Sequence, residues 1–298
     1  MSLKSSAKLS YVFLTLMVLS TLLATTGLFA NSAPVIIGAM ILAPPMAPIV
    51  SLSMGVIRAE KSLMKDSVRT LIYGIATALT FSALFTFFIP LQQITPEMQG
   101  RLNPNLLDLM VAIFSGIAGA YANAKEEIAK SLAGVAIAVA LVPPLSVTGI
   151  GIGLGNVDVI YGSFLLFITN LVGITLSAAM TFVVLGYAPI KRAQKGIIYT
   201  SVMMFIIAIP LLISFIHMVE KNDYYKKIEA FRYMELSNTK IELNILHIQT
   251  QDDSVLIDLE VLSTDAITNK DLQVIKNLIE DKIEKNVVLK VTSKIIFK

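Results

Sequence analysis

The sequence predicts a membrane-embedded all-α bundle of about seven transmembrane helices, with a 3+3 inverted repeat, two proline-broken helices and a small C-terminal α+β (ββαβ) soluble domain. Three observations support this prediction. Of the 298 residues, 55% are hydrophobic and only 15% are charged. Seven long apolar runs follow one another, and two of them contain adjacent prolines. A soluble domain of this length cannot bury so much apolar surface, whereas a lipid-facing protein need not.

Each of the seven apolar runs is close to the ~20 residues that a helix needs to cross the hydrocarbon layer. The first run is too long for a cleaved signal peptide, so we expect it to be retained as a span. The transmembrane domain is expected to cover residues 1–218, with repeat one at about 8–90, repeat two at about 105–186 and an extra span at 196–218. The runs are approximately 8–29, 33–57, 67–90, 105–122, 131–154, 158–186 and 196–218.

Basic residues in the short loops predict the orientation. Cytoplasmic loops carry an excess of Lys and Arg. The loops after the first, third and fifth runs contain a single basic residue, Arg101. The protein is therefore expected in the cell membrane, with a cytoplasmic N-terminus and the C-terminal domain outside. The N-terminus and the loops after the second, fourth and sixth runs carry the other basic residues of region 1–218: Lys4, Lys8, Arg58, Lys61, Lys65, Arg69, Lys125, Lys130, Lys191, Arg192 and Lys195.

Residues 219–298 differ in composition, being rich in Lys, Glu and Asp. A polar helix is expected over 219–240, and alternation of apolar and polar residues predicts strands after it. Thr268 and Asn269 are both suitable caps for a following helix. A unit this short buries a marginal core, so it is expected to dock on neighbours or on copies of itself. The expected elements are strands 241–250, 254–263 and 286–297 and a helix at about 270–285.

The proline pair occurs twice, as Pro44–Pro45 in the second run and Pro143–Pro144 in the fifth, with an offset of 99 residues. Runs one to three and four to six therefore resemble two units. Because three spans is an odd number, the second unit enters the membrane in the opposite sense, a plan common in transporters. The two proline segments are expected to run antiparallel near the middle of the membrane.

The prolines have a direct chemical consequence. Proline lacks an N–H and its ring clashes with the carbonyl four residues earlier, so a helix kinks or breaks there. The freed carbonyls must face protein or a water-filled cavity. Two interpretations stay open: a kink satisfied by neighbouring Ser and Thr side chains, or a pathway for a solute or ion. The candidate pathway residues are Pro44, Pro45, Pro48, Ser51, Pro143, Pro144, Thr148 and Asn170.

Other polar residues have two interpretations each. Asn170 either bonds between helices or lines the pathway. Asp108 either reaches the outer interface or carries a proton or ion. Asn31 and Asn103, which precede prolines, are expected to cap helices. The stretch TGIGIGLG (148–155) is expected to extend the second break outward, with a carbonyl-lined ion filter as an alternative.

Several segments resemble a known family. IIGAMILAPPMAPIVSLSMG, ALVPPLSVTGIGIG and LLFITNLVGI are similar to the hallmark segments of a family of uncharacterised hydrophobic prokaryotic membrane proteins, domain of unknown function 389. The similarity covers about residues 30–190. It implies a multispan membrane protein of bacteria or archaea and no established activity. The shared motif positions are Gly38, Ala39, Met40, Pro44, Pro48, Pro143, Pro144, Gly149 and Asn170.

The leading functional hypothesis is a transporter or channel for an unidentified small solute or ion. The alternatives are a non-transporting membrane sensor or oligomeric scaffold that acts through the C-terminal domain, and lipid handling through a lateral groove. The sequence contains no catalytic set, and cysteine is absent, so we expect no enzyme, metal site or cofactor. Expected partners are the lipid bilayer, an unidentified small solute or ion, and further copies of the chain in a homo-oligomer; no nucleic acid is expected.

Overall fold

The computed structural model describes residues 7–44, 46–89, 93–124, 141–188, 190–236, 239–251, 254–264 and 267–295. The chain divides into two compact units, Met1–Ser214 and Phe215–Lys298. The division falls inside one helix, α11 (Ile190–Glu229). Each unit is described by itself below.

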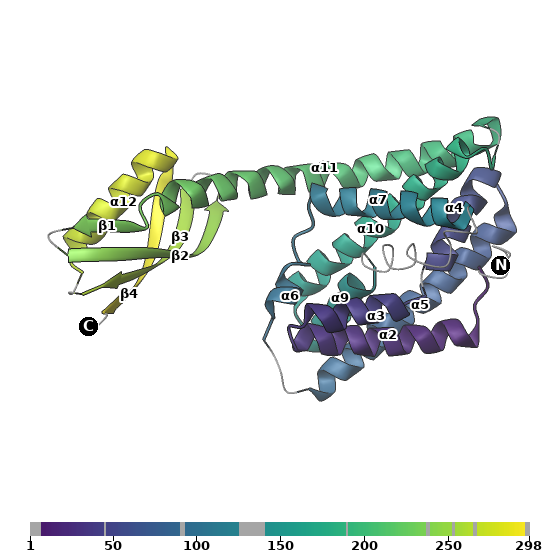
Figure 1. The fold of residues 1–298 in the computed structure, drawn as a ribbon, viewed down its shortest axis with the longest axis horizontal. Coiled ribbons are helices and arrows are strands. Elements are labelled where there is room, and N and C mark those ends of the chain that lie inside the picture. The colour runs from purple at the N-terminus through teal and green to yellow at the C-terminus, as the bar shows by residue number, and fades with distance from the viewer. Residues whose placement is uncertain are drawn as a thin grey trace. The chain divides into compact units, whose positions relative to one another are not determined.

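The first unit is helical (Figure 1). Among the described residues, five helices are long and apolar enough to cross a membrane: α2, α5, α7, α10 and the Met204–Glu229 part of α11. Counting the bent pair α3–α4 as one span gives up to six. The expected count of seven is not confirmed among the described residues; residues 125–140, which include the first part of the fifth run, lie outside them. The helices are α2 (Tyr11–Phe29), α3 (Ala33–Leu42), α4 (Met46–Arg58), α5 (Lys61–Phe88), α6 (Pro96–Gln99), α7 (Leu106–Ala124), α9 (Val142–Leu154) and α10 (Val157–Val184).

The run 33–57 is interrupted at its prolines, as its sequence predicts. Helix α3 ends at Leu42, and Ala43 has the extended backbone angles φ −72° and ψ 130°. This conformation is the one that a residue before proline prefers. Helix α4 starts again at Met46, and the two axes are bent by 55°. Pro45 lies outside the described residues.

The second proline pair starts a helix. Pro143 and Pro144 occupy the first turn of α9, where a missing N–H costs no helical hydrogen bond. Helix α9 then continues to Leu154 through the glycine-rich stretch. The expected outward extension of a break through TGIGIGLG is therefore wrong. Added Cβ atoms at Gly149 and Gly153 would meet α5, so these glycines allow close helix packing.

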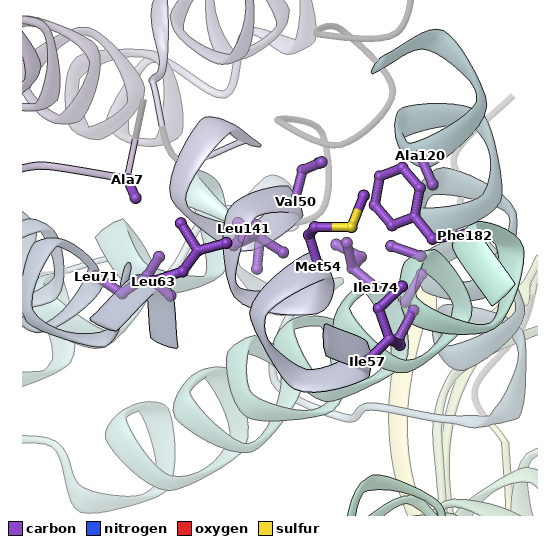
Figure 2. Close-up of a cluster of buried hydrophobic side chains, with 14 of the residues drawn as sticks. Ala7, Val50, Met54, Ile57, Leu63, Leu71, Ala120, Leu141, Ile174 and Phe182 are labelled. Carbon is purple, nitrogen blue, oxygen red and sulfur yellow. The ribbon is translucent and has the colours of Figure 1, made fainter. Parts of the chain in front are cut away.

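Helices α4 and α9 pack against the same two long helices. Helix α4 contacts α5 and α10, and α9 also contacts α5 and α10. Figure 2 shows Val50, Met54 and Ile57 of α4 near Phe182 and Ile174 of α10. All five side chains are buried in one hydrophobic cluster. The core of the first unit is therefore assembled around the two helices that follow the prolines.

Two pairs of helices in the first unit have equal lengths. Helices α2 and α7 have 19 residues each. Helices α5 and α10 have 28 residues each. In each pair, one helix belongs to the first three apolar runs, and the other lies at the matching place in runs four to six.

The second unit is an α+β domain with a four-stranded sheet in the order β1-β2-β3-β4. Strands β1, β2 and β3 pair antiparallel, whereas β4 is parallel to β3. A parallel neighbour needs a crossover connection, which α12 provides. Alternate residues of β3 are buried, together with Ile275, Ile279 and Ile283 of α12. The elements are β1 (Tyr233–Leu236), β2 (Thr239–Gln251), β3 (Ser254–Ser263), α12 (Asn269–Ile283) and β4 (Asn286–Ile295).

Two details of this unit differ from the prediction. The polar helix ends at Glu229 rather than near residue 240, and β1 adds a fourth strand. The order is therefore βββαβ. Strand β1 forms because it pairs with the start of β2, with Tyr233 opposite Glu242, and Arg232 forms an ion pair with Glu242. Of the two predicted caps, Thr268 is the N-cap of α12, in a capping box with Asp271.

Candidate functional site

The residues that flank the two proline pairs lie against each other. Ala39 of α3 is buried in one small cluster with Val142 of α9 and Ala24 of α2. Ala43, just before Pro44, packs on this cluster. Met40 of α3 also shares a core cluster with α9. The structure therefore brings together two segments that are about 99 positions apart in the sequence.

The first break frees a backbone oxygen, and a neighbouring serine binds it. In a continuous helix the Ala39 oxygen would accept the N–H of Ala43. That N–H instead bonds the Met40 oxygen at 3.2 Å. Ser20 of α2, which is fully buried, donates its hydroxyl to the Ala39 oxygen at 2.9 Å. One freed carbonyl is thus satisfied in the way that a stable kink requires.

A second set of hydroxyls connects α2, α5 and α9. Ser82 Oγ of α5 donates to the Ser146 backbone oxygen of α9 at 2.6 Å. Thr25 Oγ1 of α2 lies 3.1 Å from Ser82 Oγ and 2.8 Å from the Thr21 backbone oxygen. All of these side chains are fully buried. Hydroxyls of α2 therefore connect to both proline segments. Ser20 bonds the Ala39 oxygen directly, and Thr25 connects to the Ser146 oxygen through Ser82.

Further hydroxyls connect the helices that follow the prolines to α10. Thr148 Oγ1 donates to the Pro144 oxygen at 2.9 Å and lies 2.9 Å from Ser163 Oγ of α10. Ser53 of α4 bonds the Thr175 oxygen of α10 at 2.9 Å. Buried interhelical hydrogen bonds of this kind hold membrane helices together.

A small apolar cavity of about 20 Å³ lies where these helices meet. Leu71 and Ile75 of α5 line it, together with Phe167 and Leu171 of α10. Leu71 and Phe167 are 96 positions apart, and so are Ile75 and Leu171. The two helices also start 96 positions apart. The cavity has room for about one water molecule, and its walls are apolar. The other residues that line it come from beside the prolines (Ile49, Leu141, Val142 and Leu145), from α2 (Phe13 and Met17) and from α5 (Gly74).

The predicted pathway residues have different environments. Pro44 is half-buried. Asn170 is 4% exposed and lies in α10 next to Leu171, which lines the cavity. Pro45 lies outside the described residues. The remaining predicted residues are buried in the helices that follow the prolines: Pro48, Ser51, Pro143, Pro144 and Thr148.

Asp108 has a local partner at the start of α7. Its Oδ2 accepts the backbone N–H of Asn105 at 2.9 Å, and Asn105 Oδ1 accepts the N–H of Leu107 at 2.8 Å. This reciprocal arrangement is a helix cap, so Asn105 caps α7 and the expected cap at Asn103 is wrong. The ion-carrying role of Asp108 stays a prediction.

The expected cap at Asn31 is also wrong. Ser32 is the N-cap of α3, whereas Asn31 adopts a left-handed φ of 49°. Its Oδ1 accepts the N–H of Glu97 in α6 at 3.1 Å. An Asn side chain tolerates this backbone conformation better than most residues do. Asn31 therefore holds the loop before α3 against α6.

Sequence analysis missed Ser20, Thr25 and Ser82 as part of the site. Their signal is weak, because Ser and Thr in apolar helices often bond only to their own helix, as Thr26 does to the Leu22 oxygen. Within the described ranges, no three His, Cys, Asp or Glu side chains are grouped so that they could hold a metal ion. The site therefore consists of hydroxyls, backbone oxygens and apolar side chains.

Comparison with known proteins is consistent with the motifs. An uncharacterized protein of Methanocaldococcus jannaschii is 31% identical over 189 residues, which is 63% of this chain and 59% of that protein. This chain thus matches about 59% of the length of that relative. The family model described as Domain of unknown function (DUF389) matches residues 40–176, which include both proline pairs and Asn170. The match of this family model to residues 40–176 confirms the resemblance that the motifs indicate.

Proposed function

We propose that this membrane protein is a transporter or channel, and that a small solute or ion passes between two three-span units that enter the bilayer in opposite senses. One observation carries the proposal: α5 and α10 present residues at matching positions, Leu71 and Ile75 against Phe167 and Leu171, to one cavity beside both proline segments. A pathway on the axis that relates two inverted units is the common plan of such carriers.

The lengths and packing of the helices support the inverted repeat. The matched pairs have 19 and 28 residues. Helix α5 of the first three-span set packs on α9 of the second set, and α10 of the second set packs on α4 of the first set. A two-fold relation between the units requires such reciprocal contacts.

The cavity corresponds to a closed pathway. About 20 Å³ bounded by apolar side chains admits no hydrated ion. Opening must therefore move α5 away from α10. The kink between α3 and α4 is the natural place for such a rearrangement, because a side-chain bond from Ser20 already replaces the helical bond of the Ala39 oxygen there.

Flux into proteoliposomes tests the proposal. Pro44→Ala restores an N–H that can bond the Met40 oxygen, so we expect a straighter helix and loss of flux. Pro34→Ala is the matched control, since Pro34 lies in the first turn of α3 and its missing N–H costs no helical bond. Unchanged flux in Pro44→Ala at normal protein levels would contradict the proposal.

A second candidate is the scaffold, because the cavity is apolar and has a volume of only about 20 Å³. A protein whose kink serves only architecture would have its freed carbonyl satisfied, as the Ala39 oxygen is. For a scaffold, wild-type proteoliposomes would carry no flux across a panel of ions and small solutes. The full chain would instead form oligomers that dissociate when the surface of the C-terminal sheet is altered.

A further inference from the structure

The two edges of the C-terminal sheet are protected to different degrees. At one edge, β1 covers the start of β2, and a register shift between Ile245 and His247 interrupts the regular pairing of the rest. At the other edge, β4 pairs with β3 over its whole length without a register shift. Strand β4 contains no proline, and no strand pairs with its outer side among the described residues. A long, regular edge of this kind pairs readily with another strand.

The lysines of β4 do not block this edge. Lysine often keeps edge strands apart, because its charge resists burial between two sheets. Here Lys290 forms an ion pair with Asp258 of β3 at 3.7 Å, and Lys294 forms an ion pair with Glu260 of β3. Both side chains therefore lie over the sheet towards β3 and away from the outer edge.

The apolar core of this domain is incomplete at β4. Val255 and Leu259 of β3 are fully buried. Their neighbours on β4 are Val287, which is buried, and Val291, which is half-buried. Further along the same face of β4, Ile295 is 47% exposed. A further strand beside β4 would cover these side chains.

We propose that this further strand is the β4 of a second copy of the chain, paired antiparallel about a two-fold axis. Such a pair covers both free edges at once, because each copy presents the same edge to the other. Helix α11 continues from the apolar unit into this domain, so copies in one bilayer meet at a high effective concentration. The inference does not rest on the transport proposal, because the pairing involves only the C-terminal domain.

Like charges exclude two registers of this pairing. Directly opposite side chains of paired strands lie on the same face, so the two-fold axis passes through one residue of β4. With the axis at Lys290, that lysine is opposite its own copy. With the axis at Thr292, Lys290 is opposite Lys294 on both sides of the axis. Like charges directly opposite each other are destabilising.

An axis at Val291 gives the longest pairing that avoids these conflicts. It pairs residues 287–295 of the two copies and places Lys290 opposite Thr292. An axis two residues to either side also separates the lysines, but it leaves more of β4 unpaired. With the axis at Val291, the half-buried side chains of this residue from the two copies meet in the middle of the extended core.

Cysteine crosslinking of the full chain in its membrane tests the pairing, because the chain contains no cysteine. Directly opposite residues have Cα atoms about 4.5–5.5 Å apart, which a disulfide can span. We expect Val291→Cys to give a disulfide-linked dimer on mild oxidation. Val288→Cys should not, since its two thiols would lie roughly 20 Å apart. Leu246→Cys, at an exposed position of β2, is the control for random collisions.

Two charge variants of the exposed Thr292 test the register. Thr292→Lys places a like charge opposite Lys290 twice, so the dimer should bind roughly two- to thirtyfold more weakly. Thr292→Glu places opposite charges there and should strengthen the dimer. Within one chain, Thr292 is beside Glu260 of β3, which disfavours the glutamate variant. A stronger dimer in Thr292→Glu therefore cannot result from a better-folded monomer.

Light scattering of the purified full chain over a range of protein concentrations measures the dimer dissociation constant of each variant. Absence of a Val291→Cys dimer in the membrane would overturn the inference and leave this edge to solvent. A higher crosslinking yield for Leu246→Cys than for Val291→Cys would also overturn it, because the interface would then lie elsewhere. Equal weakening of the dimer by both Thr292 variants would contradict the register at Val291.

Discussion

Ser82 of α5 donates a 2.6 Å hydrogen bond to the backbone oxygen of Ser146 in α9, and the same side chain lies over Gly149. A Cβ atom at Gly149 would lie 2.5 Å from Ser82 Cβ and 3.0 Å from the Leu79 backbone oxygen. The two helices are therefore in direct backbone contact, as small residues permit in membranes. This contact joins the helix that starts at the second proline pair to a helix of the first set of spans.

Gly149→Ala should force α5 and α9 apart. We expect the variant to be destabilised by about 1–3 kcal/mol, because overpacking displaces backbone. The midpoint of thermal unfolding in detergent, by circular dichroism, measures the effect. Gly38→Ala is the control, since a Cβ there meets nothing within 4 Å. Equal midpoints for the two variants would show that the close contact is absent.

Ser20→Ala should leave the Ala39 oxygen without its 2.9 Å partner. We expect a loss of about 1 kcal/mol in stability, since interhelical bonds in membranes contribute about that amount. Thermal unfolding measures it, with Thr26→Val as a variant that removes a hydroxyl from the same helix without freeing an interhelical bond. A Ser20→Ala variant as stable as Thr26→Val would mean that another group satisfies the kink.

A cysteine in place of Leu171 should report opening of the pathway. The chain contains no cysteine, so a single introduced thiol is labelled without background. We expect slow labelling by a water-soluble thiol reagent at rest, because the cavity is apolar and small, and faster labelling under conditions of flux. Lys61→Cys, at the exposed start of α5, is the reference for full access. Equal rates at rest for both thiols would contradict the restricted access expected at position 171.

The predicted orientation can be checked with the same cysteine-free background. Arg101→Cys and Lys270→Cys should react with a membrane-impermeant maleimide on intact cells, because both positions are expected outside. Lys65→Cys should react only after the membrane is opened. The reverse pattern would invert the topology without changing the fold.

The C-terminal domain should lose a stabilising contact in acid. The hydrogen bond from the Lys294 ammonium lowers the pKa of the Glu260 carboxyl below its ordinary value of 4.5. When folding lowers the pKa of a carboxyl, its ionisation stabilises the folded state at pH values above the ordinary pKa. This stabilisation is lost as the pH falls through the folded-state pKa. The amides of β3 and β4 should therefore exchange faster in Glu260→Gln than in the wild type at neutral pH. At low pH the two proteins should exchange at the same rate.

Hydrogen exchange of strand amides in the full chain, compared between variants at equal pH, measures this difference. Lys294→Met should have the same effect as Glu260→Gln. Exchanging the two residues in a double variant should restore protection. A difference between variants that is independent of pH would assign the effect to packing rather than to ionisation.

Local signals in the sequence predict much of this fold. Proline chemistry places the break before Met46, and Thr268 predicts the start of α12 within one residue. The apolar runs predict where α2, α7 and α10 lie, because a helix in lipid must be continuously apolar. These features depend on residues that are close in the sequence.

Features that depend on distant partners could not be predicted. The glycine-rich stretch stays helical because α5 packs against Gly149 and Gly153, which outweighs the poor helix propensity of glycine. Strand β1 forms only because β2 is beside it. In the candidate site, the prolines were identifiable, whereas Ser20 and Ser82 gained significance only from the backbone oxygens that they reach.

The reciprocal packing of α5 on α9 and of α10 on α4 also bears on ancestry. A solitary half of this fold would leave the buried side of its own proline helix facing lipid. If the two halves form the inverted repeat proposed above and descend from one duplicated gene, the product of that gene would have been a dual-topology homodimer, with its two copies inserted in opposite orientations in the same bilayer. Co-expressed as separate polypeptides, the two halves should accordingly be recovered only as a pair.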